Sequence, residues 1–192
     1  MPVPNQAALD FLLSRRSRPA KTLVAPAPDR TALLPLLTAA ARTPDHGKLE
    51  PWRFIVLEKP ALTRLSHLVA ELAEGRNLDE AQLAKSVNQY GNADLAVAVI
   101  FTPKASDKVP EIEQVYSAGA ACLALLNAAL AAGWGANWLS GWASHDPEFR
   151  ARGLGLAKNE TIAGFIHIGT EKSTPPERPR PDLDAITTWV TD

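Results

Sequence analysis

The sequence of 192 residues predicts a single domain that combines α-helices with β-strands. Hydrophobic residues make up 46% of the chain and charged residues 21%, the ordinary balance of a globular protein with a sizeable core. Segments with helical spacing of leucines alternate with short apolar runs of strand length. A long alanine-rich segment without proline, residues 112–132, is expected to be the central helix.

The first half of the chain carries clear signals for helix ends. Pro19 ends the first helix because proline excludes the helical conformation of the residue before it. Asp29 is the expected N-cap of the second helix, Pro60 begins the third, and Gly91 follows the fourth. The predicted helices cover residues 9–13, 31–42, 60–75 and 79–89, and a strand covers residues 52–57.

The second half is predicted to hold the centre of the fold. Residues 95–101, LAVAVIF, form the unbroken apolar run of a buried central strand. Residues 118–132 are apolar or small on every side apart from Asn127, which predicts a helix buried on all sides and shorter than the ~18–20 residues of a membrane span. A strand over residues 162–169 follows. The proline-rich tail is expected to be an arm anchored by Leu183, Ile186 and Trp189.

Composition narrows the possible partners and chemistry. A net charge of −1 gives no global attraction to nucleic acid or to an anionic membrane. Cys122 is the only cysteine, which excludes an internal disulfide and suits a cytoplasmic protein; its apolar helical setting favours an inert thiol. The N-terminus has no secretory-signal pattern. The four histidines lack metal-ligand spacing, and Ser140 lacks the GxSxG context of a nucleophile, so neither a metal nor a catalytic side chain is predicted.

Three stretches are candidates for ligand binding. Residues 42–54, RTPDHGKLEPWRF, place many hydrogen-bond donors and acceptors and an imidazole ring between a helix and a strand. This composition is typical of a ligand-binding loop or of a polar surface turn stiffened by prolines. His46 is the residue in this loop that we expect to contact a ligand. Residues 133–142 combine three tryptophans with three glycines, which suits a flat aromatic ligand, although Trp134 and Trp142 could equally fill the core. Arginines occur near both ends of the chain: Arg15, Arg16 and Arg18 beside Ser17, and Arg178 and Arg180. If the two groups come together in the fold they would bind a phosphate; if they do not, each arginine is a solvated surface charge.

The motifs of this chain, in the order in which they occur along the sequence, resemble those of the nitroreductase family of flavoproteins, in particular its small single-domain branch of NAD(P)H nitroreductases. No single motif is decisive, whereas the ordered set covers almost the whole chain. The matching pieces are RRS at 15–17, PDH at 44–46, PWRFIV at 51–56, GWG at 133–135, WLSG at 138–141 and GFIHIGT at 164–170.

The resemblance implies an α+β fold with a mixed central sheet flanked by helices. It further implies one nitroreductase-like domain over residues 1–192, with a C-terminal arm from about residue 172, in an intertwined homodimer that binds FMN at its interface. The implied flavin contacts come from the arginine stretches, from the loop of the other subunit and from the WLSG backbone. They are Arg15, Arg16, Ser17, Arg42, Pro44, Asp45, His46, Lys48, Trp138, Leu139, Ser140, Gly141, Arg178 and Arg180.

The implied activity is that of a cytoplasmic FMN-dependent oxidoreductase. NADH or NADPH would reduce the flavin at N5, and a nitroaromatic, a quinone or a similar small acceptor would then reoxidise it in a ping-pong cycle. The alternatives are a flavoenzyme of the same fold with a specific non-nitro substrate, such as a dehydrogenase or ene-reductase, and a non-catalytic flavin carrier. The chain departs from the family pattern at Lys48 and Glu50, where an asparagine and a glutamine are usual. It also departs at Pro19, where many family members have a basic residue, and Arg18 or Lys21 is expected to take the place of that residue.

Overall fold

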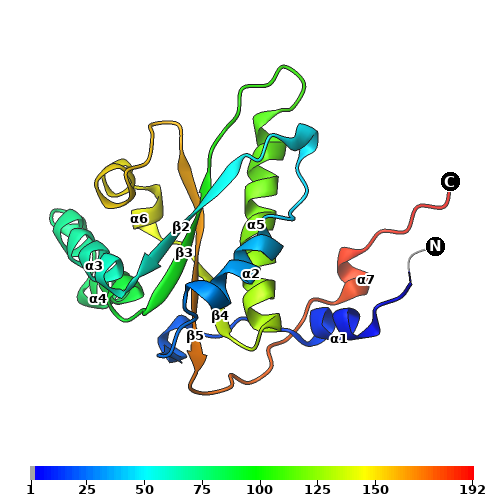
Figure 1. Cartoon of the computed structure of the whole chain (residues 1–192), viewed down its shortest axis with the longest axis horizontal. Coiled ribbons are helices and arrows are strands. Elements are labelled where there is room, and N and C mark those ends of the chain that lie inside the picture. Colours follow the sequence, from blue (N-terminus) through cyan, green and yellow to red (C-terminus); the bar gives the residue numbers. More distant parts are fainter. Residues whose placement is uncertain (1–2) are drawn as a thin grey trace.

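A five-stranded sheet runs through the middle of the protein, as seen in a computed structural model that describes residues 3–192 (Figure 1). The long strand β5 pairs with three others, and the strand order is β1-β5-β3-β2 with β4 also beside β5. The strands are β1 (Leu23–Val24), β2 (Trp52–Glu58), β3 (Leu95–Phe101), β4 (Gly135–Leu139) and β5 (Thr161–Glu171).

Helices cover both faces of this sheet. The side chain of Asp29 caps α2 by accepting a hydrogen bond from the amide of Ala32, and Asp79 with Gln82 forms a capping box at α4. The α-helices are α1 (Gln6–Ser14), α2 (Arg30–Ala40), α3 (Lys59–Ala73), α4 (Glu80–Gly91), α5 (Glu111–Ala131), α6 (Trp142–His145) and α7 (Leu183–Ile186). Short 3-10 turns, η1 (Ala20–Thr22) and η2 (His46–Lys48), and a π-helical turn, η3 (Phe149–Gly153), complete the set.

The core has two halves, one on each face of the sheet. All seven residues of β3 are buried, and they alternate between the halves because successive side chains in a strand point to opposite faces. Val97 and Val99 pack with Leu125 of α5, whereas Ala96 and Ala98 pack on the side of α3 and η3. The prediction of a buried central strand is confirmed.

The α+β class is confirmed, with one difference in the sheet. Every strand pairing within residues 3–192 is antiparallel, whereas a mixed sheet was expected. The apolar run of β3 was compatible with either arrangement because burial on both faces, and not strand direction, sets that pattern.

The central helix α5 differs from expectation in its burial. It packs against β3, β4, β5 and α2, so it is a core helix, although by length and composition it could cross a membrane. The prediction that residues 118–132 are buried on all sides is wrong within one chain, since Leu123 is 44% exposed. Tyr116, on the same side of the helix, is 67% exposed. An apolar stripe of α5 therefore faces outward.

The first and last helices, α1 and α7, lie at the same side of the body, where they project from the sheet (Figure 1). Leu183, Ile186 and Trp189 are between 66% and 86% exposed. These three side chains therefore do not anchor the tail to the rest of their own chain, although the sequence predicts that they anchor an arm. Leu12 and Leu13 of α1 are also exposed.

Candidate functional site

The segment that carries the N-terminal arginines is fixed along β4. The amide of Arg18 donates to the carbonyl of Ala136 over 2.8 Å, and Nδ2 of Asn137 donates to the carbonyl of Arg18 over 2.5 Å. The guanidinium of Arg18 lies 3.2 Å from Glu171 at the end of β5. Arg18 is thus used in holding the segment, while its neighbours Arg15 and Arg16 keep free donors.

Arg15 and Arg16 carry buried donors without a partner. Arg15 donates from Nη2 to Ser17 Oγ over 3.2 Å, but its Nε atom and the Nη1 atom of Arg16 are buried and have no hydrogen-bond partner among residues 3–192. An unpaired buried donor costs about 1–3 kcal/mol, so its presence needs an explanation. A phosphate fits, because its oxygens accept several such hydrogen bonds at once.

The C-terminal tail returns to these arginines. The pKa of Arg15 is lowered by burial and then by the nearby charge of Arg180. Glu177 lies 2.8 Å from Arg180; its pKa is lowered by a hydrogen bond from the amide of Arg178 and by the charges of Arg180 and Arg16. We name Arg15, Arg16 and Arg180 the arginine cluster. The tail therefore returns close enough to the N-terminal arginines for the charge of Arg180 to act on Arg15.

A pocket of about 460 Å³ opens between β4 and α4, and we call it the α4 pocket. Its size is that of a small-ligand site. Of the predicted site residues, Leu139 and Ser140 line it. The other lining residues come from η1, from one face of α4 and the residues after it, and from β5: Ala20, Lys21, Lys85, Asn88, Gln89, Asn92, Ala93 and His167.

The α4 side chains escaped the sequence analysis. Lys85, Asn88, Gln89 and Asn92 follow a spacing of three and four, which is the signal of one helix face. A polar helix face is ordinarily a solvated surface, so the pattern alone did not indicate a pocket.

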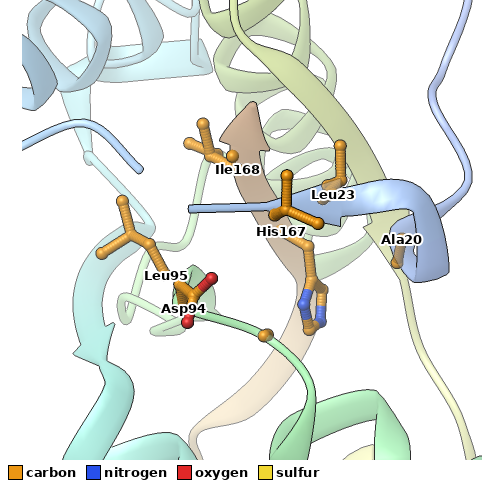
Figure 2. A pocket seen from close by; sticks show the side chains of 9 residues that line it. Ala20, Leu23, Asp94, Leu95, His167 and Ile168 are labelled. Atoms are coloured by element: carbon orange, nitrogen blue, oxygen red, sulfur yellow. The ribbon is translucent and has the colours of Figure 1, made fainter. Parts of the chain in front are cut away.

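Two polar side chains inside the α4 pocket lack partners. The Nε2 atoms of Gln89 and His167 are both buried without a hydrogen bond. Burial lowers the pKa of His167 to about 4, which keeps its imidazole neutral near pH 7. Figure 2 shows this ring directed from β5 toward the space between Ala20 and Asp94, where a small cavity of about 10 Å³ adjoins the pocket.

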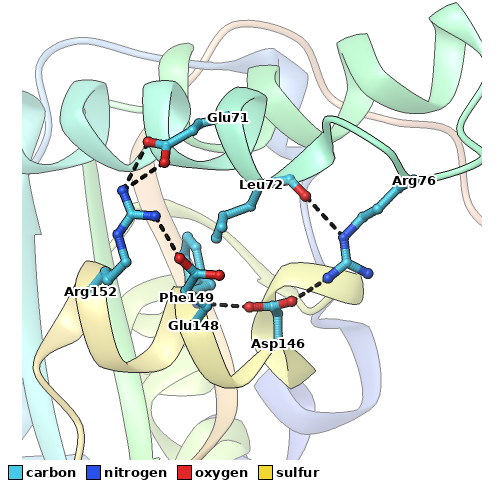
Figure 3. Close-up of polar contacts among 7 residues, drawn as sticks. All are labelled: Glu71, Leu72, Arg76, Asp146, Glu148, Phe149 and Arg152. Carbon is cyan, nitrogen blue, oxygen red and sulfur yellow. Dashed lines mark hydrogen bonds and ion pairs between the residues drawn. The ribbon is translucent and has the colours of Figure 1, made fainter.

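The turn that follows β4 is fastened to α3. Arg76 donates to Asp146 and, over 3.1 Å, to the carbonyl of Leu72 (Figure 3). Its guanidinium also stacks 4.3 Å from the ring centre of Trp142. Arg152 of η3 bridges Glu148 and Glu71 at 2.7 and 2.8 Å. Trp142 also donates from Nε1 to Ser86 Oγ of α4 over 3.0 Å, and it does not line the pocket.

Trp138 also differs from a simple flavin wall. It lies on β4 with its indole over Gly164 of β5, where an added Cβ would overlap the ring. Its neighbours on β4, Leu139 and Asn137, point to the opposite face because side chains alternate along a strand. Its side chain is consequently absent from the lining of the α4 pocket, which on this strand begins at Leu139.

The loop of residues 42–51 is held by α5. His46 Nδ1 lies 2.7 Å from Glu113 Oε2, and Ser117 Oγ donates to the carbonyl of Pro44 over 3.0 Å. Lys48 and Glu50 have φ angles of 54° and 49°, a left-handed conformation that costs about 1 kcal/mol or more for each side-chain-bearing residue. Strain held by a rigid helix is typical of a binding segment.

This loop is remote from the α4 pocket within one chain. The carbonyl of Pro51 accepts from the amide of Thr102, just after β3 ends, whereas Ala93 lines the pocket just before β3 begins. The seven residues of β3 span ~23 Å. The structure thus brings together Arg15, Arg16, Ser17 and Arg180, and separately Leu139 and Ser140. It leaves Arg42, Pro44, Asp45, His46 and Lys48 at the far end of the sheet.

Comparison with known proteins gives a consistent result. The family model described as Nitroreductase family matches residues 12–170. YdjA of Escherichia coli strain K12, provisionally named an NAD(P)H nitroreductase, is 36% identical over 163 residues, which cover 85% of this chain and 87% of YdjA.

Solved structures share the fold. A nitroreductase-like protein from Bacillus cereus superposes with a TM-score of 0.79 at 22% identity, covering 99% of this chain and 98% of its own. A protein from Desulfovibrio desulfuricans solved in complex with FMN gives 0.76 at 20% identity, covering 99% of this chain and 100% of its own.

Proposed function

Because the chain belongs to the nitroreductase family, we propose that it is an FMN-dependent oxidoreductase that uses NADH or NADPH to reduce a small acceptor such as a nitroaromatic or a quinone. The name of YdjA and the FMN bound by the Desulfovibrio protein support this proposal. The observation that carries it is the pair of buried, unpaired donors on Arg15 and Arg16 beside Arg180. They fit a phosphomonoester at one end of a site whose other end is the α4 pocket.

Different residues would bind the phosphate and the ring of FMN. The arginine cluster and Ser17 would hold the phosphate, and the backbone of Trp138 to Gly141 would border the ring. Bound FMN would supply the redox chemistry, so no side chain has to act as a nucleophile. Lys21 and Lys85 at the pocket would favour negative charge on the ligand.

We further propose that the site is completed by a second copy of the chain. The 42–51 loop and the α4 pocket lie at opposite ends of β3, so Arg42, Pro44, Asp45, His46 and Lys48 can reach a bound flavin only from a partner. A two-fold axis across the exposed stripe of α5 would place each loop at the far end of the neighbouring chain. The exposed apolar side chains of α1 and the tail would then be covered.

In this assembly, residues 1–192 form one domain whose arm, from about residue 172, lies against the partner. The exposed Leu183, Ile186 and Trp189 are suited to such docking. We propose that this dimer works in the cytoplasm, a compartment that suits a chain with one buried, unpaired cysteine.

A spectroscopic experiment tests the proposal. The purified protein should be yellow or take up FMN, and anaerobic NADH or NADPH should bleach its visible absorbance until a nitroaromatic or quinone restores it. Bound flavin that no nicotinamide nucleotide bleaches would indicate a carrier. Bleaching without turnover of these acceptors would indicate a different specific substrate. A protein that takes up no FMN would overturn the proposal.

A further inference from the structure

His167 is an unusual residue for its position. It lies in the middle of β5, where its neighbours Ile166 and Ile168 are core side chains, and it is only 2% exposed. Its cross-strand neighbours are Asn137 on β4 and Ala96 on β3. An apolar residue would satisfy this strand without the cost of burying an imidazole.

The structure gives His167 no internal partner for its buried Nε2 atom. Leaving such a group unpaired costs about 1–3 kcal/mol, which is a large share of the stability of a small domain. Buried polar groups left unpaired by the protein are commonly satisfied by water or by a ligand.

The neighbouring groups indicate what that ligand presents. Gln89 also has a buried, unpaired Nε2 in the same pocket, and this amide nitrogen can only donate. A neutral imidazole offers one donor and one acceptor. A ligand edge that alternates acceptors with a donor, as the pyrimidine portion of a flavin does, can satisfy both side chains at once.

The arginine cluster lies outside this pocket. None of its residues lines the α4 pocket, which begins on this segment at Ala20. The three residue-to-residue steps from Ser17 to Ala20 span at most ~10 Å. A phosphate and a ring joined by a flexible linker could therefore be held at two separate places along β4.

We propose that the His167 imidazole hydrogen-bonds the polar edge of the ligand's ring system on the floor of the α4 pocket, with Gln89 beside it. This inference rests on the proposed function for the identity of the ring. It assigns to β5 a binding residue that acts on the ring and not on the phosphate. The competing occupant is one water molecule, for which the adjoining cavity of about 10 Å³ is just large enough.

Two ligands and three variants separate the possibilities. The dissociation constants of FMN and of riboflavin, which lacks the phosphate, are measured by fluorescence for the wild-type protein, His167→Val, His167→Gln and Arg16→Ala. His167→Val should weaken both ligands by the same factor, roughly tenfold, since one lost hydrogen bond amounts to about 1–1.5 kcal/mol. His167→Gln keeps a donor and an acceptor and should stay within about threefold of wild type. Arg16→Ala should weaken FMN alone.

The ligand-free proteins give a second readout. Removing an unpaired buried group is nearly neutral or stabilising, so apo His167→Val should unfold at the same temperature as wild type or higher. In wild-type protein with ¹⁵N-labelled histidine, the Nε2 resonance of His167, identified by its absence in His167→Gln, should move when riboflavin is added. This measurement needs no destabilising variant.

The outcomes are distinct. Riboflavin binding to His167→Val as tightly as to wild type, or an Nε2 resonance that riboflavin does not move, would overturn the role of His167 and leave the proposed function intact; a trapped water would then explain the residue. Wild-type protein that binds neither FMN nor riboflavin would overturn both.

Discussion

His46 Nδ1 lies 2.7 Å from Glu113 Oε2, and this contact ties the 42–51 loop to the first turn of α5. One helical turn further along, Ser117 accepts a hydrogen bond from Trp52 Nε1 and donates to the carbonyl of Pro44. A loop with two left-handed residues is thus held at both ends by one rigid helix.

Replacing Glu113 with alanine should weaken FMN binding several-fold while leaving the folded chain nearly as stable. Both partners are about half exposed, so the pair contributes at most about 1 kcal/mol to the free energy of unfolding. Flavin fluorescence titration and thermal melts provide the two measurements. Glu111→Ala, in the same first turn but without a partner residue, is the control. Equal flavin affinity in Glu113→Ala and wild type would show that the pair does not position the loop.

Replacing Leu123 with glutamate should separate the dimer and release the flavin together. Leu123 is 44% exposed on the outward stripe of α5, and the proposed interface would have to bury the new charge. Analytical ultracentrifugation gives the oligomeric state, and the ratio of visible to ultraviolet absorbance gives the flavin content. Leu83→Glu on α4, with a similar exposure of 37%, is the matched control. A monomer that retains its flavin would contradict the shared site.

Replacing Glu160 with glutamine should destabilise the protein at neutral pH but not in acid. Glu160 accepts from Arg53 at 2.7 and 2.8 Å, and this pairing lowers its pKa from 4.5 to about 2. Because the folded pKa lies below the unfolded value, the stabilisation is complete above about pH 4.5 and is lost as the pH falls toward 2. With allowance for the partial exposure of Arg53, we expect a difference of about 2 kcal/mol at pH 7.

Denaturant unfolding of both proteins across this pH range checks the prediction. Asp107→Asn, which removes an exposed carboxylate, should behave as wild type at every pH. If the difference in unfolding free energy between wild type and Glu160→Gln stays constant down to pH 2, the effect comes from packing and not from the charge of Glu160.

Cys122 should not react with thiol reagents in the native protein. It is fully buried on α5, and burial raises the pKa of its thiol to about 12, so almost no reactive thiolate exists at neutral pH. A chromogenic disulfide reagent should release no colour until denaturant is added. Rapid labelling of the native protein would show that α5 opens readily.

Most of the fold could be predicted from local signals. The spacing of apolar residues, the caps at Asp29 and Asp79 and the apolar run of β3 each act within a few residues, and each element appears close to its predicted place. The largest error concerned the burial of α5. An alanine-rich sequence shows that a helix can be packed closely on all sides, but it does not show whether the packing elements come from the same chain or from another chain.

The candidate site divides in the same way. Local sequence patterns are enough to identify the family motifs, the elements that carry them and the chemistry of the arginines at both chain ends. Three features appear only in the folded chain: the charge of Arg180 acts on Arg15, Gln89 and His167 share one pocket, and the 42–51 loop lies a strand's length away. Contacts between residues distant along the chain depend on the register and packing of whole elements, which no local pattern encodes.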